Sequence, residues 1–292
     1  MEDINPVDFK VTNRINLREL STLLETSASD EEKEEHLDQS RNKLSKLQDK
    51  MYAHNRYSVL ICLQGMDTSG KDSLIREVFK EMNPRGVVVH SFKTPNSTEL
   101  EHDYLWRHYL ALPEKGKIAV FNRTHYENVL VTRVHPEYIL GENLPGIDKV
   151  EDISEAFWAK RLDQIRNFEQ HLFENGMIIL KFYFHMSKDE QKKRLLRRLE
   201  EEKHNWKFSV GDLKERERWD DYMRFYEEAI NKTSTENAPW FVIPADDKEY
   251  ARCIVGNIVL EELKKRSDID EPELDEKVKA NIDVYRQMLE NE

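Results

Sequence analysis

The sequence is poor in cysteine and has no long apolar run, and each absence excludes a class of protein. Two of its 292 residues are cysteines, Cys62 in an apolar segment and Cys253 on an expected helix. We interpret both as buried thiols in a reducing compartment rather than as a disulfide or a metal site. No apolar run approaches the roughly 18 residues that cross a bilayer. No early segment joins a basic start to an apolar core, as a secretory signal would. We therefore expect a cytoplasmic protein with no membrane partner.

The sequence also lacks an excess of positive charge. Its formal net charge is −12 and its pI is near 5.4, with 35% charged and 38% hydrophobic residues. General nucleic-acid binding calls for a basic surface, so we expect no nucleic-acid partner. Any polyanionic ligand must therefore find basic residues that are concentrated locally.

Five short apolar runs alternate with helical patterns along the chain. The runs are rich in β-branched and aromatic residues and lie at 57–63, 87–92, 117–122, 177–184 and 239–244. Such nearly unbroken runs are typical of strands in a parallel sheet that is covered on both faces. Amphipathic patterns predict helices near 71–82, 99–111, 154–175, 188–203, 211–232 and 247–265. The alternation predicts a three-layer α/β/α fold around a five-stranded parallel sheet.

We expect one domain, residues 1–292, with helical extensions at both ends. Residues 1–55 are predicted to form an N-terminal helical arm, in which Leu37, Leu44, Leu47 and Met51 make a narrow apolar stripe. Residues 56–265 are the predicted core. Residues 266–292 form an acidic tail that we expect to be helical after Pro272.

A phosphate-binding loop follows the first predicted strand. The stretch GMDTSGK (65–71) matches G-x-x-x-x-G-K and stands between a strand and an amphipathic helix. In such loops glycines permit unusual backbone angles, amides converge on a phosphate, and a lysine adds a positive charge. The alternative is a coincidental turn with a solvated Lys71. We expect phosphate or nucleotide contacts from Gly65, Met66, Thr68, Ser69, Gly70, Asp72 and Ser73.

Two acids in this loop need an explanation, because carboxylates repel anions. A polyphosphorylated donor arrives with Mg²⁺, which takes oxygen ligands from one or two carboxylates and from phosphates. We expect Asp67 to hold the metal, or alternatively to position the attacking phosphate oxygen. Asp72 follows Lys71 where Ser or Thr is usual, and compensation of the helix dipole explains it simply. Ser73 is a candidate for the missing hydroxyl.

Polar residues follow the third predicted strand, where doubly wound folds gather functional groups. Arg123 is predicted to neutralise charge on the transferred phosphoryl group, with a surface ion pair as the alternative. Asn122 stands where nucleotide kinases often carry an acid, and Glu127 is a candidate for the missing metal-binding carboxylate. His125 and Tyr126 are expected to pack or hydrogen-bond. Further along, Arg133 and His135 are candidates for a phosphate channel.

The stretch SKDEQKKRLLRRLEEE (187–202) predicts a basic helix that starts at the N-cap Ser187 with Glu190 in a capping box. A helical projection places Leu195, Leu196 and Leu199 on one face and the arginines opposite. A solvated charged face is the plain alternative. The helix follows the fourth strand, where phosphate-loop kinases have a lid, and guanidinium groups suit phosphate oxygens. Candidate ligands for phosphate oxygens are Arg133, Arg194, Arg197 and Arg198.

Taken together, these residues resemble the polyphosphate kinase 2 family. The resemblance covers about residues 56–265. It is carried by GMDTSGKDS, FKTPNSTELEHDYLWRHYLALPEKGKIAVFNRTHYENVLVTRVHPE, the arginine helix, HNWKFSVGDLKERERWDDYMRFYEEAI and APWFVIPADDKEYAR. It implies a P-loop kinase-like fold similar to thymidylate kinases, with a lid at about 187–210. It also implies Asp67 and Lys71 at the transfer point, Arg123 beside them, and lid arginines on the polymer.

The resemblance implies phosphoryl transfer between inorganic polyphosphate and nucleotides, with Mg²⁺, or Mn²⁺ in its place, as cofactor. Many members carry Asp-Arg after the third strand and Asn where Glu127 stands. The Asn-Arg…Glu arrangement here is similar to the subgroup that accepts both AMP and ADP. We expect reversible formation of ATP, and of GTP from GMP and GDP, by a homo-dimer or tetramer. Two alternatives are an ATP-dependent nucleoside monophosphate kinase and a non-catalytic sensor of nucleotide or polyphosphate, which Asn122 keeps open.

Overall fold

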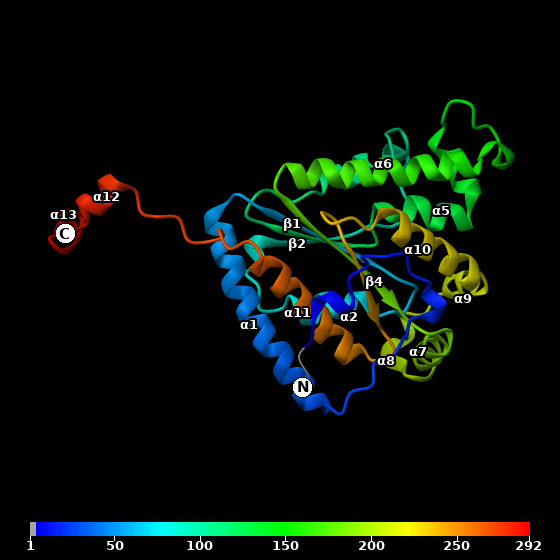
Figure 1. Ribbon diagram of the computed structural model, residues 1–292, viewed down its shortest axis with the longest axis horizontal. Coiled ribbons are helices and arrows are strands. Elements are labelled where there is room, and N and C mark those ends of the chain that lie inside the picture. The colour runs from blue at the N-terminus through cyan, green and yellow to red at the C-terminus, as the bar shows by residue number, and fades with distance from the viewer. Residues whose placement is uncertain (1–3) are drawn as a thin grey trace.

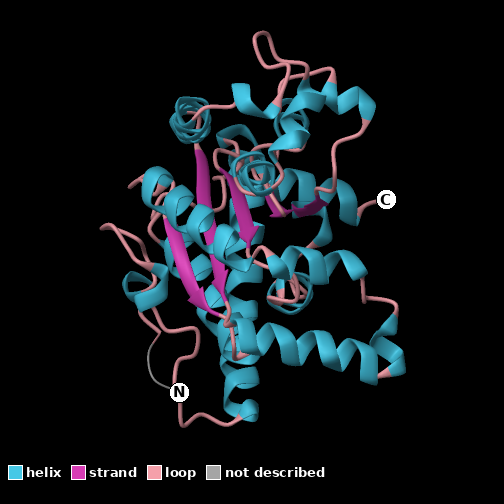
Figure 2. Ribbon diagram, turned by 90° about the vertical axis from the view of Figure 1, so that its right-hand side faces the viewer, coloured by secondary structure: helices cyan, strands magenta, loops and turns pink. Residues whose placement is uncertain are grey.

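The computed structural model describes residues 4–292 and confirms the predicted α/β class. Its strands are β1 (Ser58–Gln64), β2 (Val87–Ser91), β3 (Ile118–Asn122), β4 (Met177–His185) and β5 (Trp240–Pro244). They form one parallel sheet in the order β2-β3-β1-β4-β5, which is drawn in magenta in Figure 2. From β1 the chain crosses to β2 at one edge of the sheet, and from β3 it crosses back over β1 to β4 on the other side. This change of direction opens a crevice at the carboxyl ends of β1 and β3.

Helices cover both faces of the sheet, as Figure 1 shows. On one side lie α2 (Lys71–Val78) and α11 (Lys248–Lys264), with α1 (Asp30–His54) packed on α11. On the other side lie α6 (Glu155–Glu174) and α10 (Trp219–Thr233). Every residue of β1, β3 and β4 is buried. That burial explains why the sequences of the three strands are nearly unbroken apolar runs.

Residues 4–29 differ from the prediction of a wholly helical N-terminal arm. Only α1 is a long helix; before it the chain is mainly extended, with the 3₁₀ turns η1 (Pro6–Asp8) and η2 (Leu17–Glu19). The amide of Val11 donates to the carbonyl of Trp240 (2.8 Å), and the amide of Val242 donates to that of Phe9 (2.9 Å). The segment thus covers the free edge of β5, whose backbone groups would otherwise lack partners. The predicted arm begins at residues 1–3, which lie outside the described part.

Several predicted helices are shorter or divided. The region 99–111 contains α3 (Ser97–Leu100) and α4 (Trp106–Leu110), and 211–232 divides at Arg218 into α9 (Val210–Glu217) and α10. The basic region contains α7 (Lys188–Glu200) and α8 (Glu202–Asn205). Between β3 and α6 the chain forms η4 (His125–Val129), α5 (Val131–Val134), η5 (Pro136–Glu142) and η6 (Val150–Asp152), and η3 (Pro84–Gly86) precedes β2. The single-domain division of the chain stays a prediction.

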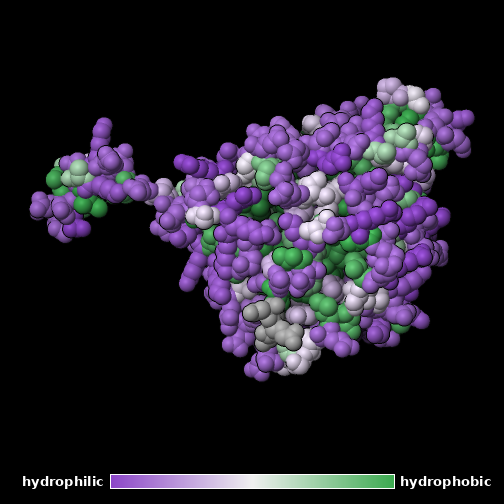
Figure 3. All heavy atoms as spheres, viewed as in Figure 1, coloured by the Kyte–Doolittle hydropathy of each residue, from purple (hydrophilic) through white to green (hydrophobic). Residues whose placement is uncertain are grey.

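The tail is helical after Pro272, as expected, in α12 (Glu276–Ala280) and α13 (Ile282–Glu290). In Figure 1 both helices project away from the body, and in Figure 3 hydrophobic side chains show on them against a mostly hydrophilic face. Cys62 and Cys253 are free and buried, as expected, and the reducing compartment stays a prediction. Within residues 4–292, no helix combines the length and the apolar character that crossing a membrane would demand.

Candidate active site

The phosphate loop connects β1 to α2 in backbone conformations that glycine allows. Gly65 has φ 151° and Gly70 has φ 105°, both in the region that L side chains rarely adopt. A Cβ on Gly65 would also lie 3.0 Å from Ser69 Oγ and 3.1 Å from Phe184 Cβ. Gly70 is the N-cap of α2, so the first free amides of that helix open at the loop. The turn therefore has the backbone geometry of a cradle for an anion.

Lys71 lies inside this cradle. Its Nζ donates to the carbonyls of Gly65 (2.6 Å) and Met66 (3.2 Å) and to Ser69 Oγ (3.3 Å). Burial lowers the pKa of Lys71, and the nearby carboxylate of Asp67 opposes that shift. The ammonium is thus poorly solvated and held by neutral oxygens, which anionic phosphate oxygens can replace at a gain.

Asp67 and Arg123 meet across the crevice. Arg123 Nη2 donates to Asp67 Oδ1 at 2.9 Å, although 56 residues separate the two along the chain. The ion pair is partly exposed, with 47% of the Arg123 side chain and 25% of the Asp67 side chain accessible. Arg123 has φ 60°, an uncommon value for a residue other than glycine. The pair places one cation and one carboxylate beside the phosphate loop, where they can rearrange around a ligand.

Asp72 has a partner that the sequence did not reveal. Asn122 Nδ2 donates to Asp72 Oδ1 at 2.6 Å, and it lies 3.5 Å from Ser91 Oγ. Asp72 therefore ties the start of α2 to the end of β3, beyond any effect on the helix dipole. Asn122 suits this contact because an aspartate there would set two carboxylates against each other. Ser73 Oγ donates to the Gly70 carbonyl at 2.9 Å.

Glu127 lies just behind the crevice. Its Oε1 accepts a hydrogen bond from Gln64 Nε2 at 3.0 Å. Burial raises the pKa of Glu127, and the charges of Arg123 and Lys71 oppose the rise. Within residues 4–292, no three His, Cys, Asp or Glu side chains group as a complete metal site. A hard cation here would take oxygens from Asp67, with Glu127 near by, and complete its shell with phosphate and water, which is how Mg²⁺ usually binds.

The basic helix α7 begins at the N-cap Ser187, as predicted, and lies directly on the phosphate loop. Gln191 Nε2 donates to the Asp67 carbonyl (3.1 Å), and Arg194 Nη1 donates to that of Thr68 (3.0 Å). Arg194 Nη2 also donates to the carbonyls of Ala245 (2.7 Å) and Asp246 (2.9 Å). Arg194 thus joins the loop to the end of β5.

The predicted faces of α7 are wrong in part. Of the three leucines predicted to share one face, Leu195 is buried, whereas Leu196 and Leu199 are exposed. Arg194 points inward, because backbone carbonyls of the loop and of the residues just after β5 accept its hydrogen bonds. Arg197 and Arg198 are less enclosed. Arg197 pairs with Glu201 (2.6 Å) and Arg198 with Asp212 (2.8 Å).

A cleft of about 830 Å³ opens over these groups. It is basic although the chain as a whole is acidic, because eight Lys and Arg side chains line it against two carboxylates, Asp67 and Asp72. The lining cations are Lys71, Lys93, Arg123, Arg194, Arg197, Arg198, Lys207 and Lys248. Sequence reasoning missed Lys93, Lys207 and Lys248. Lys93 follows β2 and Lys248 follows β5, so the rule that singled out the end of β3 also pointed to them.

Arg133 and His135 lie elsewhere. Arg133 donates to Glu228 (2.7 Å) and Glu155 (3.1 Å), and its guanidinium stacks over Phe225 at 4.3 Å. His135 Nε2 lies 3.0 Å from Glu215 Oε2. Carboxylates and an aromatic face already occupy the Arg133 head group, and the residue does not line the cleft. We therefore leave both residues out of the phosphate path.

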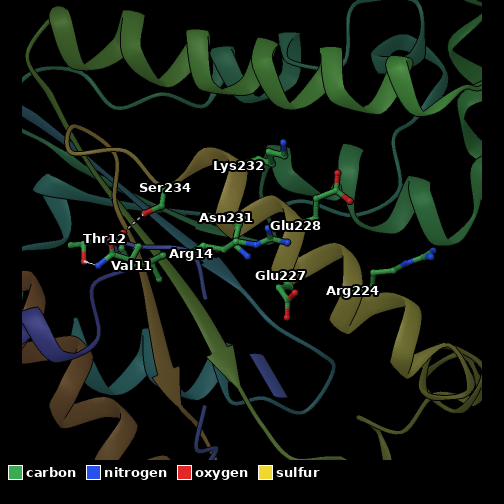
Figure 4. Close-up of a pocket in the computed structure, with 10 residues that line it drawn as sticks. Val11, Thr12, Arg14, Arg224, Glu227, Glu228, Asn231, Lys232 and Ser234 are labelled. Carbon is green, nitrogen blue, oxygen red and sulfur yellow. Dashed lines mark hydrogen bonds between the residues drawn. The ribbon is translucent and has the colours of Figure 1, made fainter. Parts of the chain in front are cut away.

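A second cavity, of about 560 Å³, lies between residues 11–14 and α10 (Figure 4). Several of its polar groups hold the N-terminal segment in place. Asn231 bonds both the amide and the carbonyl of Ile15 (2.8 and 2.9 Å), and Ser234 Oγ donates to the Val11 carbonyl (2.7 Å). Glu228, also in its lining, is the partner of Arg133. This cavity contains no residue of the phosphate loop, so the basic cleft is the candidate active site.

The fold and the cleft define a P-loop kinase-like phosphotransferase with a basic cleft. Comparison with known proteins makes this specific. The chain belongs to the polyphosphate kinase 2 family, because the family model described as Polyphosphate kinase 2 matches residues 27–139 and 142–271.

Individual relatives agree with the family. The chain is 51% identical over 222 residues to an ADP-polyphosphate phosphotransferase of Rhodopseudomonas palustris, covering 76% of each protein. It is 46% identical to an AMP/ADP-polyphosphate phosphotransferase of Meiothermus ruber, covering 76% of this chain and 78% of the relative. The crystal structure of polyphosphate kinase 2 from Arthrobacter aurescens matches with a TM-score of 0.88 and 35% identity, covering 98% of this chain and 99% of that one.

Proposed function

We propose that this protein transfers a phosphoryl group between inorganic polyphosphate and nucleoside mono- and diphosphates. The acceptors are AMP and ADP, with GMP and GDP as further ones, and the products are ATP and GTP. The observation that carries the proposal is the cleft, whose eight cations meet at a phosphate loop in a chain of net charge −12. A mononucleotide alone needs fewer cations than this, whereas a long polyanion can engage many at once.

In the proposed reaction, a phosphate oxygen of the acceptor attacks the terminal phosphorus of the polymer. A new O–P bond forms as the bridging P–O bond breaks, and the polymer leaves one unit shorter; the reverse step uses the same groups. Lys71 and Arg123 neutralise charge on the group in transfer. The loop amides hold the phosphate in line, and Arg197 and Arg198, with Lys93, Lys207 and Lys248, bind the polymer. The lid at about 187–210, which contains α7 and α8, keeps water from the transferred group.

A divalent cation, for which we propose Mg²⁺ with Mn²⁺ as a substitute, fits the donor set of this site. When bound, it would screen the charges of donor and acceptor phosphates and hold them together. Asp67 would supply its protein oxygen, and Glu127 is the second candidate. The Asp67–Arg123 pair (2.9 Å) keeps that carboxylate at the mouth of the loop until a ligand arrives.

Lys248 should make the binding of polyphosphate depend on pH. Burial lowers the pKa of Lys248 to about 8, and the charges of Arg194 and Arg197 add to the effect. The side chain is therefore mostly cationic at pH 7 and mostly neutral at pH 9. We expect the KM for polyphosphate to rise over this range, because one lining charge disappears. In Lys248→Arg the guanidinium stays charged, so a flatter KM profile is expected. Identical profiles in the two proteins would show that Lys248 does not bind the polymer.

The decisive experiment is a product analysis. The purified protein is incubated with Mg²⁺ and AMP, ADP, GMP or GDP, with either long-chain polyphosphate or ATP as donor, and the nucleotides are separated by chromatography. We expect ADP and ATP from AMP, and ATP from ADP, with polyphosphate as donor, and loss of both when a chelator is added. Transfer from ATP but not from polyphosphate would identify a nucleoside monophosphate kinase. Binding without turnover at the same Mg²⁺ concentration would identify a sensor. A homo-oligomer and a cytoplasmic location remain predictions.

A further inference from the structure

The side chains of the segment that follows β3 point in two directions, some to the cleft and others to the protein interior. Arg123 points to the cleft and Glu127 lies just behind it, whereas His125 and Tyr126 turn into the protein interior and are fully buried. The same short stretch therefore carries proposed functional groups on one side and anchors on the other. Because η4 gives it little regular structure, the position of Arg123 depends on what holds the two inward side chains.

A buried ion pair holds them. Lys181 on β4 donates to Glu169 Oε2 on α6 at 2.5 Å, and neither side chain is more than 1% exposed. Glu169 Oε1 accepts from Tyr126 Oη at 2.8 Å and lies 3.1 Å from His125 Nε2. One carboxylate thus binds a cation with one oxygen and both anchors with the other.

The network reaches two further elements. Lys181 Nζ donates to the Thr233 carbonyl at the end of α10 (2.8 Å) and to Tyr126 Oη (3.0 Å). Trp240 Nε1 on β5 donates to Thr233 Oγ1 (2.9 Å). Four elements of the core therefore fix one loop. Lys181 is a charged residue within a central strand, and charges are found there only when they are paired and hydrogen-bonded.

The backbone conformation of the loop explains why so many buried polar groups hold it. Arg123 has φ 60°, which costs free energy for a residue with a side chain. Such a conformation persists only where its surroundings over-determine it. On one side, Asn122 is fixed by Asp72; on the other, Thr124 Oγ1 accepts from the Tyr126 amide at 3.1 Å. The Glu169 contacts then fix the next two side chains.

We propose that Glu169 and Lys181 are positioning residues, which hold Arg123 and Glu127 in register with the phosphate loop by anchoring His125 and Tyr126. The role of Arg123 in transfer, on which this inference rests, is part of the proposed function. Neither positioning residue lines the cleft. Their effect is on the geometry of the transition state, so it falls on kcat more than on KM.

Two double variants without charge test the inference. Replacing a buried ion pair by apolar groups of similar size is often tolerated, whereas removing one partner leaves a buried charge. Glu169→Leu with Lys181→Met removes both charges and the acceptor of His125 and Tyr126. Glu169→Gln with Lys181→Met removes both charges but keeps an amide oxygen as acceptor. We expect kcat to fall about 10- to 100-fold in the first variant, with KM within about threefold of the wild type, and largely to recover in the second.

A readout that needs no activity separates this inference from the proposed function. Hydrogen exchange of the amides at 122–128 is expected to accelerate in the Leu/Met variant and to stay near wild type in the Gln/Met variant. A structural control, Arg41→Met, removes a buried cation that bonds to the Glu77 carbonyl at 2.6 Å in the α1–α2 contact; its kcat should match the wild type. Wild-type kcat and exchange in the Leu/Met variant would overturn the inference. An equal loss of kcat in both double variants would also overturn it.

Discussion

Lys71→Ala is expected to lower kcat for transfer from polyphosphate to ADP by at least about 10³-fold, with the fold retained. In the structure the ammonium sits among the carbonyls of Gly65 and Met66, at the centre of the amide cradle. Charge on a phosphoryl group in transfer is spread over its oxygens, and a cation fixed in a poorly solvated site stabilises it more than water does. We expect the loop to keep its backbone conformation without this side chain, because the positive φ angles belong to Gly65 and Gly70, so folding should survive.

Initial rates with saturating polyphosphate and circular dichroism of the same samples measure the two parts of this prediction. Lys43→Ala is the matched control, because it removes an exposed lysine from α1, far along the chain from the loop. Its rate should equal that of the wild type. A Lys71→Ala protein that keeps a tenth or more of the wild-type kcat would show that the loop binds phosphate without assisting transfer.

Much of the fold could be predicted because its signals are local. The strands β1, β3 and β4 are buried on both faces, so each leaves a nearly unbroken apolar run that can be recognised without knowing its neighbours. The glycine pattern before Lys71 likewise describes a single turn. Residues 9–11 left no such signal, because their extended form depends on the edge of β5, more than 200 residues away.

The site was harder to predict, since its contacts join distant parts of the chain. Asp67 and Arg123 were both identified, but their ion pair spans 56 residues and has no sequence signature. The pairing of Asn122 with Asp72 was missed for the same reason. Projection onto an ideal helix failed for Arg194, since it cannot show that loop carbonyls would accept hydrogen bonds from an arginine and draw it inward.

Asp67→Asn distinguishes two explanations for an acid inside an anion cradle. If Asp67 only repels phosphate, removing its charge should tighten polyphosphate binding and raise the rate. If it holds a divalent cation, kcat should fall by at least about 100-fold, and the Mg²⁺ concentration for half-maximal rate should rise. We expect the second result. In this variant the 2.9 Å partner of Arg123 loses its negative charge but keeps an oxygen that accepts a hydrogen bond, so polyphosphate binding should not weaken even as transfer is lost.

Titrating Mg²⁺ at fixed polyphosphate and ADP separates the two effects. Asp72→Asn is the control, because it changes the charge of the same loop at a carboxylate that already accepts a hydrogen bond from Asn122 at 2.6 Å. Asp72→Asn should lose less activity than Asp67→Asn and show the wild-type Mg²⁺ dependence. If kcat and the Mg²⁺ dependence of Asp67→Asn are both unchanged, the carboxylate of Asp67 does not bind the metal. The oxygens for the cation would then have to come from Glu127 and from the substrates themselves.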